Sequence, residues 1–353
     1  MGLRFADWPP EILALLRKGV VIPAHPLALD ARRQLDPRRQ RALARYYLDA
    51  GAGGLAVGVH TTQFAVREAG LYQPVLELAM HAAAEWCQRP IVMIAGLVGR
   101  THQAVQEAQT ARGVGYHAGL LSLAAMKGAS EDELIEHARA VAEEIPLVGF
   151  YLQPAVGGIV LSAAFWRRFA GIENVAAIKI APFNRYRTLD VVRGVVEAGA
   201  TARVTLYTGN DDHIIPDLVT PYKVPSKGDF TTVRIRGGLL GHWSVWVRKA
   251  VELLEQAQAA AAARVVPADL LALDSQVTDC NAAIFDVANN FHGVIAGCHE
   301  ILRRQGLLEG IWCLDPGESL GPGQKEEIDR VYAAYPDLND DAFVRQNLAR
   351  WLA

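Results

Sequence analysis

Short apolar segments alternate with longer segments of helical periodicity along most of this chain. The apolar segments are mostly continuous and rich in β-branched residues, as expected for strands that are covered on both faces. Eight of them are candidate strands: Val20–Pro23, Gly54–Gly58, Ile91–Ala95, Tyr116–Leu123, Val148–Leu152, Ala176–Ile180, Val204–Tyr207 and Val233–Leu239. The clearest amphipathic stretches between them are Pro37–Ala50, Arg67–Gln88, Thr101–Arg112, Ser130–Glu144, Ser162–Ala170 and Leu189–Ala198. This alternation predicts parallel strands joined by helices.

Eight strand–helix units are the number that closes a (β/α)₈ TIM barrel, so we expect residues 1–264 to form such a barrel with a short N-terminal extension. A doubly wound open sheet is the alternative, because the same alternation serves both folds. No candidate strand runs into a GxGxxG turn, which argues against the open sheet. The segment Asp217–Thr232, which contains PYKVPSKGDF, is long and polar. We interpret it as a loop insertion beside the active face.

The remaining residues, 265–353, have a different pattern. Helical periodicity covers Ala268–Ala288 and His292–Arg304, LDPGESLGPGQ then interrupts it, and two more helical segments follow. We expect a C-terminal helical region packed on the barrel.

Composition narrows the class of protein. Hydrophobic residues make up 51% of the 353 residues and charged residues 21%, so the chain can bury a sizeable core. A net charge of −3 with scattered Lys and Arg gives no reason to expect nucleic acid or an anionic membrane as a partner. The N-terminus lacks a signal-peptide pattern, no run of apolar residues is long enough to span a membrane, and the four cysteines form no CxxC pair. We therefore expect a cytoplasmic protein with buried thiols.

Lys179 is the most informative polar residue. It lies near the end of an otherwise apolar strand, in NVAAIKIAP, and catalytic groups of such barrels lie at the carboxyl ends of strands. Burial would disfavour the charged form of the lysine, and a neutral amine can attack a carbonyl to form a Schiff base. The alternative is a lysine whose stem packs inward while its ammonium group reaches solvent. Tyr151 ends the preceding strand, so its phenol could face the same cavity and transfer protons, or simply close the barrel as an ordinary aromatic residue.

Two further turns carry polar residues. His60, Thr61 and Thr62 follow the second strand and could hold a carboxylate in a tight loop. Gly209, after the seventh strand, permits close approach of a ligand to the backbone. Asp211, Asp212 and His213 follow it directly, but adjacent residues on one loop converge poorly on a metal ion, so we interpret the two carboxylates as helix N-terminal charges.

Taken together, these segments resemble the dihydrodipicolinate synthase and N-acetylneuraminate lyase superfamily of class I (Schiff-base) aldolases. That superfamily has a GTTGE loop after strand two, a YNxP turn after strand five, a lysine on strand six and an SGxD turn after strand seven. The similar segments here are VHTTQF, YLQP from Tyr151, AAIK with Lys179, and TGND around Gly209. GGLLGHWSV (237–245) is similar to the glycine-rich turn after strand eight, and the resemblance extends over essentially the whole chain.

The resemblance implies that Lys179 condenses with pyruvate or another 2-keto acid and that Tyr151 acts as acid and base. The substrate carboxylate would be bound by the loop after strand two, with either His60 and Thr61 or Thr61 and Thr62 at the positions of the two family threonines. Gly209 and the backbone of Trp243 match further carboxylate-contacting positions. The resemblance implies no metal ion and no organic cofactor, and a homo-oligomer, either a tetramer built from dimers or a dimer.

The departures from the family pattern concern the second substrate. LSLAAMKGASED lacks the tyrosine that reaches a neighbouring subunit in the synthases, and Val156 stands where the synthases place a carboxylate-binding arginine. Arg185 and Arg187 could meet an anionic substrate instead, or be solvated charges at a helix start. We therefore expect a lyase or aldolase with a different second substrate. The alternatives are a keto-acid dehydratase or hydratase-aldolase that uses the same imine, and a catalytically idle keto-acid-binding paralogue.

Overall fold

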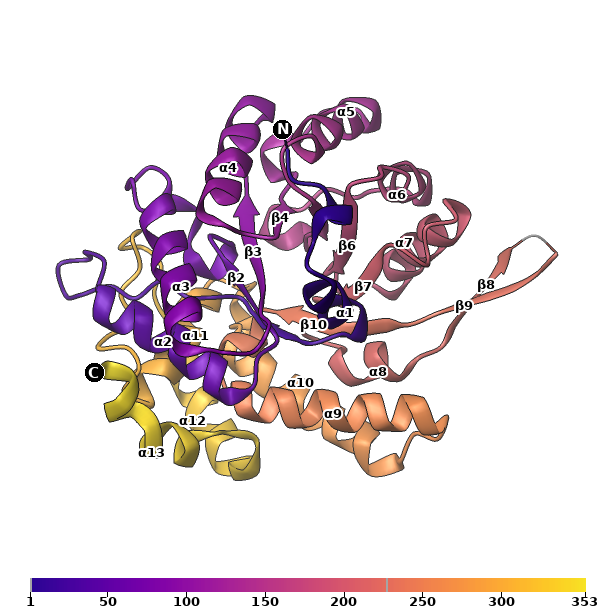
Figure 1. Ribbon diagram of the computed structural model, residues 1–353. Helices are drawn as coiled ribbons and strands as arrows, with labels where there is room; N and C mark the ends of the chain where they lie inside the picture. Colours follow the sequence, from indigo (N-terminus) through magenta and orange to yellow (C-terminus); the bar gives the residue numbers. More distant parts are fainter. Residues whose placement is uncertain (1, 227) are drawn as a thin grey trace.

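A ring of eight parallel strands forms the centre of the computed structural model, which describes residues 2–226 and 228–353 (Figure 1). The sheet order is β1-β10-β7-β6-β5-β4-β3-β2, and a parallel bridge between Ala24 and Ala56 joins the two outer strands. The strands are β1 (Val21–Pro23), β2 (Gly54–Val57), β3 (Val92–Leu97), β4 (Ala118–Leu121), β5 (Leu147–Tyr151), β6 (Val175–Ile180), β7 (Thr205–Thr208) and β10 (Ile235–Leu240). The predicted (β/α)₈ barrel is thus confirmed, and the open sheet is excluded.

A helix follows each strand on the outside of the ring. These helices are α2 (Pro37–Ala50), α3 (Tyr72–Trp86), α4 (Thr101–Val114), α5 (Glu131–Ala142), α6 (Ala163–Ala170), α7 (Arg185–Glu197), α8 (Ile214–Val219) and α9 (Val247–Ala263). Local signals set their ends: Ser130 and Glu133 form a reciprocal capping box at the start of α5. Gly51, with φ of 102°, ends α2 in the left-handed conformation that favours glycine.

Strand residues alternate between two apolar cores. Val148 and Phe150 of β5 point into the barrel, whereas Leu147 and Tyr151 point outward to the helices. In β6 the alternation holds from Ala177 on: Ala177 faces inward, whereas Ile178 and Ile180 face outward. Side chains two residues apart in a strand therefore lie on the same face, and side chains of adjacent residues lie on opposite faces.

The amino-terminal end of the barrel is closed by the first residues of the chain. The 3₁₀ helix η1 (Phe5–Asp7) and helix α1 (Pro10–Lys18) place Phe5, Trp8 and Leu16 in the inner core. Tyr207 of β7 donates a hydrogen bond from its hydroxyl to the Leu16 carbonyl over 2.8 Å. With this end plugged, ligands can enter only at the carboxyl end.

The interpretation of Asp217–Thr232 as a loop beside the active face is wrong. The segment begins with the last residues of α8 and continues as an antiparallel hairpin of β8 (Tyr222–Ser226) and β9 (Asp229–Val233), which projects from the barrel (Figure 1). Lys227 lies outside the described residues. The hairpin returns the chain to the amino end of β10, and none of its described residues lines the cavity at the other end.

Four helices follow the barrel: α10 (Ala268–Ile284), α11 (Val294–Arg304), α12 (Gln324–Ala334) and α13 (Asp341–Leu352). α10 packs on α8, and α13 packs on α2. The buried Asp340 accepts hydrogen bonds from Tyr46 of α2, the Arg248 amide of α9 and Gln305, so one carboxylate ties this region to the barrel. The remaining 3₁₀ helices are η2 (His60–Thr62), η3 (Phe64–Val66), η4 (Ala124–Met126), η5 (Pro154–Val156), η6 (His242–Ser244), η7 (Val287–Asn289) and η8 (Pro336–Leu338).

Two smaller expectations concern membranes and thiols. Among the described residues, no helix combines the length and the apolar character needed to cross a bilayer. All four cysteines are unpaired; Cys280, Cys298 and Cys313 are buried, and Cys87 is partly exposed.

Candidate active site

Lys179 lies inside the barrel near its carboxyl end, at the penultimate position of β6. Its backbone pairs in register with Phe150 of β5, and its ammonium nitrogen lies 4.4 Å from the centre of the Phe150 ring. Only 8% of the residue is exposed, and Nζ has no hydrogen bond or ion pair within the described residues. A buried amine with so few partners is unusual and marks a candidate nucleophile.

Two opposing effects set the pKa of Lys179. Burial lowers it well below the ordinary value of 10.5, and the negative charge of Asp211 raises it in part. Burial also raises the pKa of Asp211, while the His242 amide and the Lys179 charge act in the opposite direction. The pKa values of the two groups therefore approach each other. The neutral pair, an amine beside a carboxylic acid, comes closer in free energy to the ion pair than it would be in water.

Asp211 is the site residue that the sequence reasoning missed. It lines the same cavity as Lys179, is 5% exposed, and accepts a hydrogen bond at Oδ1 from the His242 amide over 2.8 Å. Asp212, in contrast, points away to Arg185. The interpretation of Asp211 and Asp212 as a pair of helix N-terminal charges is therefore wrong for Asp211.

Gly209 provides the room that the Lys179 side chain needs. A Cβ at this position would lie 2.6 Å from Cε of Lys179 and 2.7 Å from Cβ of Ala181, closer than real contacts allow. The Gly209 amide donates to the Ile180 carbonyl over 2.7 Å, so it is already engaged in the barrel. The residue lines the cavity as expected, but its contribution is space rather than a donor for a substrate carboxylate.

The turn after β2 forms η2 and brings His60 and Thr61 to the cavity. Burial lowers the pKa of His60 to about 4, and the Lys179 charge acts in the same direction, so the imidazole is neutral. Thr61 donates its hydroxyl hydrogen to the Ala24 carbonyl. Thr62 does not line the cavity. Its hydroxyl accepts hydrogen bonds from the Gly58 and Val59 amides and donates one to the backbone carbonyl of His25. The arrangement favours His60 and Thr61 over Thr61 and Thr62 as the cavity pair.

Tyr151 does not share the cavity, and that prediction is wrong. Because Phe150 faces Lys179, its neighbour Tyr151 points outward, where its ring packs 5.2 Å from that of Trp166. The Tyr151 hydroxyl donates to the Leu161 carbonyl over 3.2 Å and accepts from the Leu161 amide over 3.1 Å. The phenol thus fixes the chain between β5 and α6, and no tyrosine is among the residues that line the Lys179 cavity.

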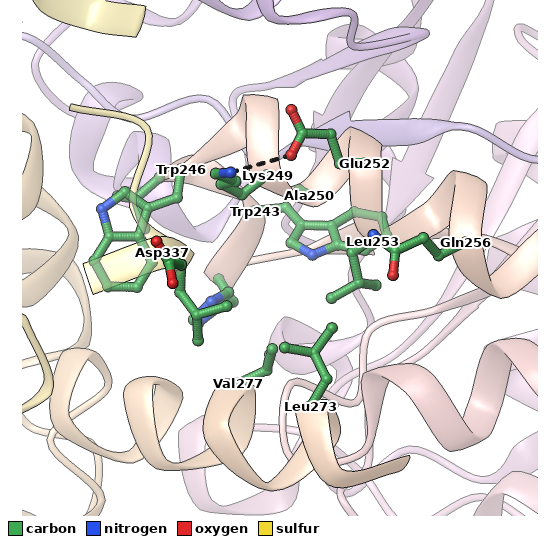
Figure 2. A pocket seen from close by; sticks show the side chains of 13 residues that line it. Trp243, Trp246, Lys249, Ala250, Glu252, Leu253, Gln256, Leu273, Val277 and Asp337 are labelled. Atoms are coloured by element: carbon green, nitrogen blue, oxygen red, sulfur yellow. Dashed lines mark hydrogen bonds and ion pairs between the residues drawn. The ribbon is translucent and has the colours of Figure 1, made fainter. Parts of the chain in front are cut away.

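Trp243 is likewise outside the cavity, contrary to expectation. It lines a separate groove of about 230 Å³ between α9 and α10, together with Leu253 and Val277 (Figure 2). The turn after β10 contributes Gly241 to the cavity wall and the His242 amide to Asp211 instead. Neither Lys179 nor Asp211 lines the groove, so we place the chemistry at the barrel mouth.

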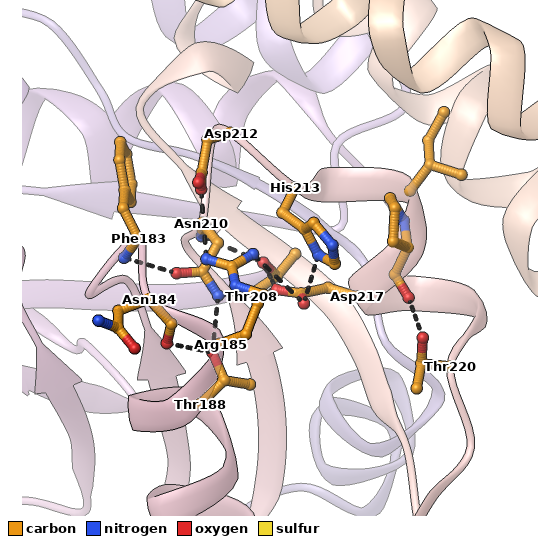
Figure 3. A network of polar contacts seen from close by, with 12 residues as sticks. Phe183, Asn184, Arg185, Thr188, Thr208, Asn210, Asp212, His213, Asp217 and Thr220 are labelled. Atoms are coloured by element: carbon orange, nitrogen blue, oxygen red, sulfur yellow. Dashed lines mark hydrogen bonds and ion pairs between the residues drawn. The ribbon is translucent and has the colours of Figure 1, made fainter.

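A network of polar contacts beside the cavity includes Arg185, Asp212, His213 and Asp217 (Figure 3). Asp217 is fully buried at its centre, and Arg185 forms an ion pair with Asp212 over 3.4 Å. His213 contacts Asp217 through Nδ1 over 3.1 Å, and Arg187 pairs with Asp190 over 3.2 Å. These side chains stabilise the turns around the site and do not line the Lys179 cavity. Within residues 2–226 and 228–353, no three His, Cys, Asp or Glu side chains cluster as a metal site would require.

The cavity itself has a volume of about 70 Å³. Its polar lining comes from Lys179, Asp211, His60, Thr61 and Gln153. The rest of its wall is apolar or glycine: Ala24, Val59, Phe150, Leu152, Val156, Ala181, Phe183, Gly209, Gly241, Phe285, Phe291 and Val294.

Comparison with known proteins agrees with this architecture. The family model described as the dihydrodipicolinate synthetase family matches residues 18–220, more than half of the chain. The chain is 28% identical over 201 residues to 4-hydroxy-tetrahydrodipicolinate synthase of Desulforudis audaxviator (strain MP104C). That match covers 57% of this chain and 66% of the relative, just under two thirds of its length.

Two solved structures have the same fold. One is the chloride-inhibited dihydrodipicolinate synthase of Acinetobacter baumannii complexed with pyruvate, with a TM-score of 0.72 at 18% identity, covering 89% of this chain and 98% of that one. The other is N-acetylneuraminate lyase of Fusobacterium nucleatum, with a TM-score of 0.71 at 15% identity, covering 90% and 99%. The chain therefore belongs to the dihydrodipicolinate synthetase family.

Proposed function

We propose that this protein is a class I aldolase or lyase in which Lys179 forms a Schiff base with the keto carbon of pyruvate or another 2-keto acid. The observation that carries the proposal is a buried lysine of lowered pKa in a cavity at the carboxyl end of a barrel, with no hydrogen-bond partner among the described residues. The pyruvate bound to the similar synthase of Acinetobacter baumannii supports the choice of a 2-keto acid.

The neutral Lys179 amine attacks the keto carbon and forms a carbinolamine. Loss of water from it requires a proton on the departing hydroxyl, and the cavity offers Asp211 as the donor. In the imine, the positive nitrogen acidifies the C3 hydrogens, and the Asp211 carboxylate accepts one of them. The resulting enamine adds to an aldehyde, or, in the reverse direction, the bond beyond C3 breaks. Water then hydrolyses the imine and returns the free amine.

The substrate carboxylate is assigned to the turn after β2. The neutral imidazole of His60 can donate one N–H to it, and the Thr61 oxygen can contribute polarity from the adjacent position. His60→Ala should mainly weaken keto-acid binding, seen as a higher KM for pyruvate.

Borohydride trapping tests the proposal. Incubation with pyruvate and sodium borohydride should add one reduced pyruvyl group, located on Lys179 by peptide mass mapping. Lys179→Arg keeps the positive charge but has no nucleophilic amine, so trapping should vanish. Lys249→Arg is the matched control. Lys249 lies on α9 in an ion pair with Glu252, away from Lys179, so this variant should trap pyruvate as the wild-type protein does. A group trapped elsewhere, or none at all, would contradict the proposal and favour an idle binding protein.

We also propose a cytoplasmic homo-oligomer, a tetramer or a dimer, on the strength of the family resemblance. Because no tyrosine occupies the segment after β4, subunit contacts should matter little for the chemistry. Light scattering with activity measured across a dilution series tests this, and a fully active monomer would contradict the assembly.

A further inference from the structure

The outer wall of the Lys179 cavity is built from aromatic and aliphatic side chains, several of them from the C-terminal helical region. Phe285 follows α10, Phe291 lies in the loop before α11, and Val294 begins α11. Phe183, from the turn after β6, meets Phe291 with their ring centres 5.9 Å apart and the rings nearly perpendicular. The C-terminal region therefore covers the mouth of the site with apolar surface.

The same wall provides no positive charge for a second anion. Lys179 is the single Lys or Arg among the cavity-lining residues that the structure describes, and its nitrogen is neutral in the enamine that adds to the aldehyde. His60 is neutral, and the one carboxylate of the wall, Asp211, would repel an anion once deprotonated. Val156 lines the cavity on the side of the β5–α6 connection and contributes an apolar side chain there. An anionic group buried there would lose its hydration without compensation.

The cavity that the two reactants would share is small, with a volume of about 70 Å³. Phe183, Phe285 and Phe291 line it together with Lys179. A second reactant that reaches the keto acid on Lys179 therefore meets these rings.

We propose that the aldehyde partner of this site is uncharged and carries an aliphatic or aromatic group that packs against Phe183, Phe285 and Phe291. In the addition direction, a carbon–carbon bond forms between C3 of the enamine and the aldehyde carbon, and the aldehyde oxygen takes up a proton. In cleavage, that bond breaks, the hydroxyl loses its proton, and the same aldehyde leaves. This inference rests on the proposed Schiff-base function and adds the class of second substrate.

The test compares aldehydes with pyruvate as the common partner. Hexanal and benzaldehyde represent the apolar class and succinic semialdehyde the anionic class; consumption of pyruvate and formation of the adduct are followed by mass spectrometry. We expect kcat/KM for the apolar aldehydes to exceed that for the anionic one by roughly 30-fold or more, the effect of one unpaired buried charge.

A charge introduced into the wall sharpens the test. Val156→Arg should raise kcat/KM for succinic semialdehyde by about tenfold and lower it for hexanal. Val160→Arg is the matched control: it lies in the same connection, is 56% exposed, does not line the cavity, and should leave the preference unchanged. Phe291→Ala, with Phe291→Leu in case the alanine variant folds poorly, should reduce the rate with benzaldehyde more than with succinic semialdehyde.

The outcomes separate the two proposals. If pyruvate is not trapped on Lys179, the Schiff-base function itself fails. If pyruvate is trapped but the wild-type protein prefers succinic semialdehyde, or turns over neither class, the inference about the second substrate is overturned while the Schiff-base function stands.

Discussion

Two buried carboxylates that follow β7, Asp211 in the turn and Asp217 six positions later in α8, have opposite surroundings. Asp217 is fully buried at the centre of a network that also fixes Asn210 (Figure 3). Its contacts come from Thr208, Asn210, His213 and Tyr222 by hydrogen bonds and from Arg185 by an ion pair at 4.0 Å. Asp211 is 5% exposed and faces Lys179. Its carboxylate accepts a hydrogen bond from the backbone amide of His242.

The difference distinguishes a carboxylate that stabilises the fold from one that is available for proton transfer. A buried charge whose lone pairs are all engaged stabilises one geometry, because moving its proton would cost several hydrogen bonds at once. A buried carboxyl with few partners, beside a buried amine, can gain or lose a proton at little structural cost. On this argument, Asp217 holds the turn and Asp211 is left available to react.

Replacing Asp211 should give the largest effect on chemistry. Asp211→Asn keeps the shape and the bond from the His242 amide but removes the titrating group. We expect the rate of imine formation with pyruvate to fall by roughly 10²–10⁴, the usual contribution of a general acid or base, with little change in unfolding midpoint. Rapid-quench borohydride trapping measures the rate. Asp212→Asn is the control, since its ion pair with Arg185 is partly solvated and its loss should leave the rate nearly unchanged. Equal effects of the two substitutions would remove the distinction between them.

Replacing Asp217 should act on stability instead. Asp217→Asn replaces one carboxylate oxygen with an NH₂ group, which cannot accept hydrogen bonds from the donors around it. We therefore expect the free energy of unfolding to fall by about 2–4 kcal/mol. Chemical denaturation measures it, and Asp132→Asn, which removes an exposed ion pair with Arg168, should cost less than about 1 kcal/mol. If Asp217→Asn folded with wild-type stability but lost trapping, the roles of the two carboxylates would have to be exchanged.

The pH dependence of trapping tests the coupling between Asp211 and Lys179. Only the neutral amine attacks, and burial lowers the pKa of Lys179, so the rate should rise with pH well below 10.5. Because Asp211 must carry a proton to protonate the departing hydroxyl, the rate should fall again at higher pH, once Asp211 is ionised. The Asp211 charge raises the pKa of Lys179, so Asp211→Asn should shift this rise to lower pH, by about one unit. A rise centred near 10.5, or a shift to higher pH in the variant, would show that the two groups are not neighbours in solution.

The sequence was sufficient to predict the barrel and the position of Lys179 in a buried strand, because both follow from the pattern of apolar residues. Eight apolar runs separated by helices have few alternative packings, and a lysine in an apolar strand stands out whichever face it occupies. The hairpin β8–β9 escaped prediction because Lys-Val-Pro-Ser (223–226) has the composition of a loop, and only pairing with Asp229–Val233 makes it a strand.

The errors at the site come from information that the sequence does not carry. In β5 both faces are apolar, so Gly149-Phe150-Tyr151-Leu152 gives no sign of which aromatic residue points inward. A shift of one residue exchanges every side chain between the two cores, and the register with β6 decides it. Asp211 and Asp212 are adjacent and chemically identical, and only the His242 amide, 31 positions further on, distinguishes them.

The placement of Tyr151 leads to the prediction of smallest effect. Tyr151→Phe removes the hydroxyl that bonds both the carbonyl and the amide of Leu161, leaving two buried backbone groups unpaired. We expect a loss of about 1–2 kcal/mol in the free energy of unfolding and a trapping rate within about twofold of wild type. Tyr116→Phe is the matched control, since Tyr116 is equally buried on the outer face and its hydroxyl makes one bond, to the Leu76 carbonyl. If Tyr151→Phe slowed imine formation by orders of magnitude while Tyr116→Phe did not, the phenol would have to reach the cavity during the reaction, and Asp211 would not be the proton donor.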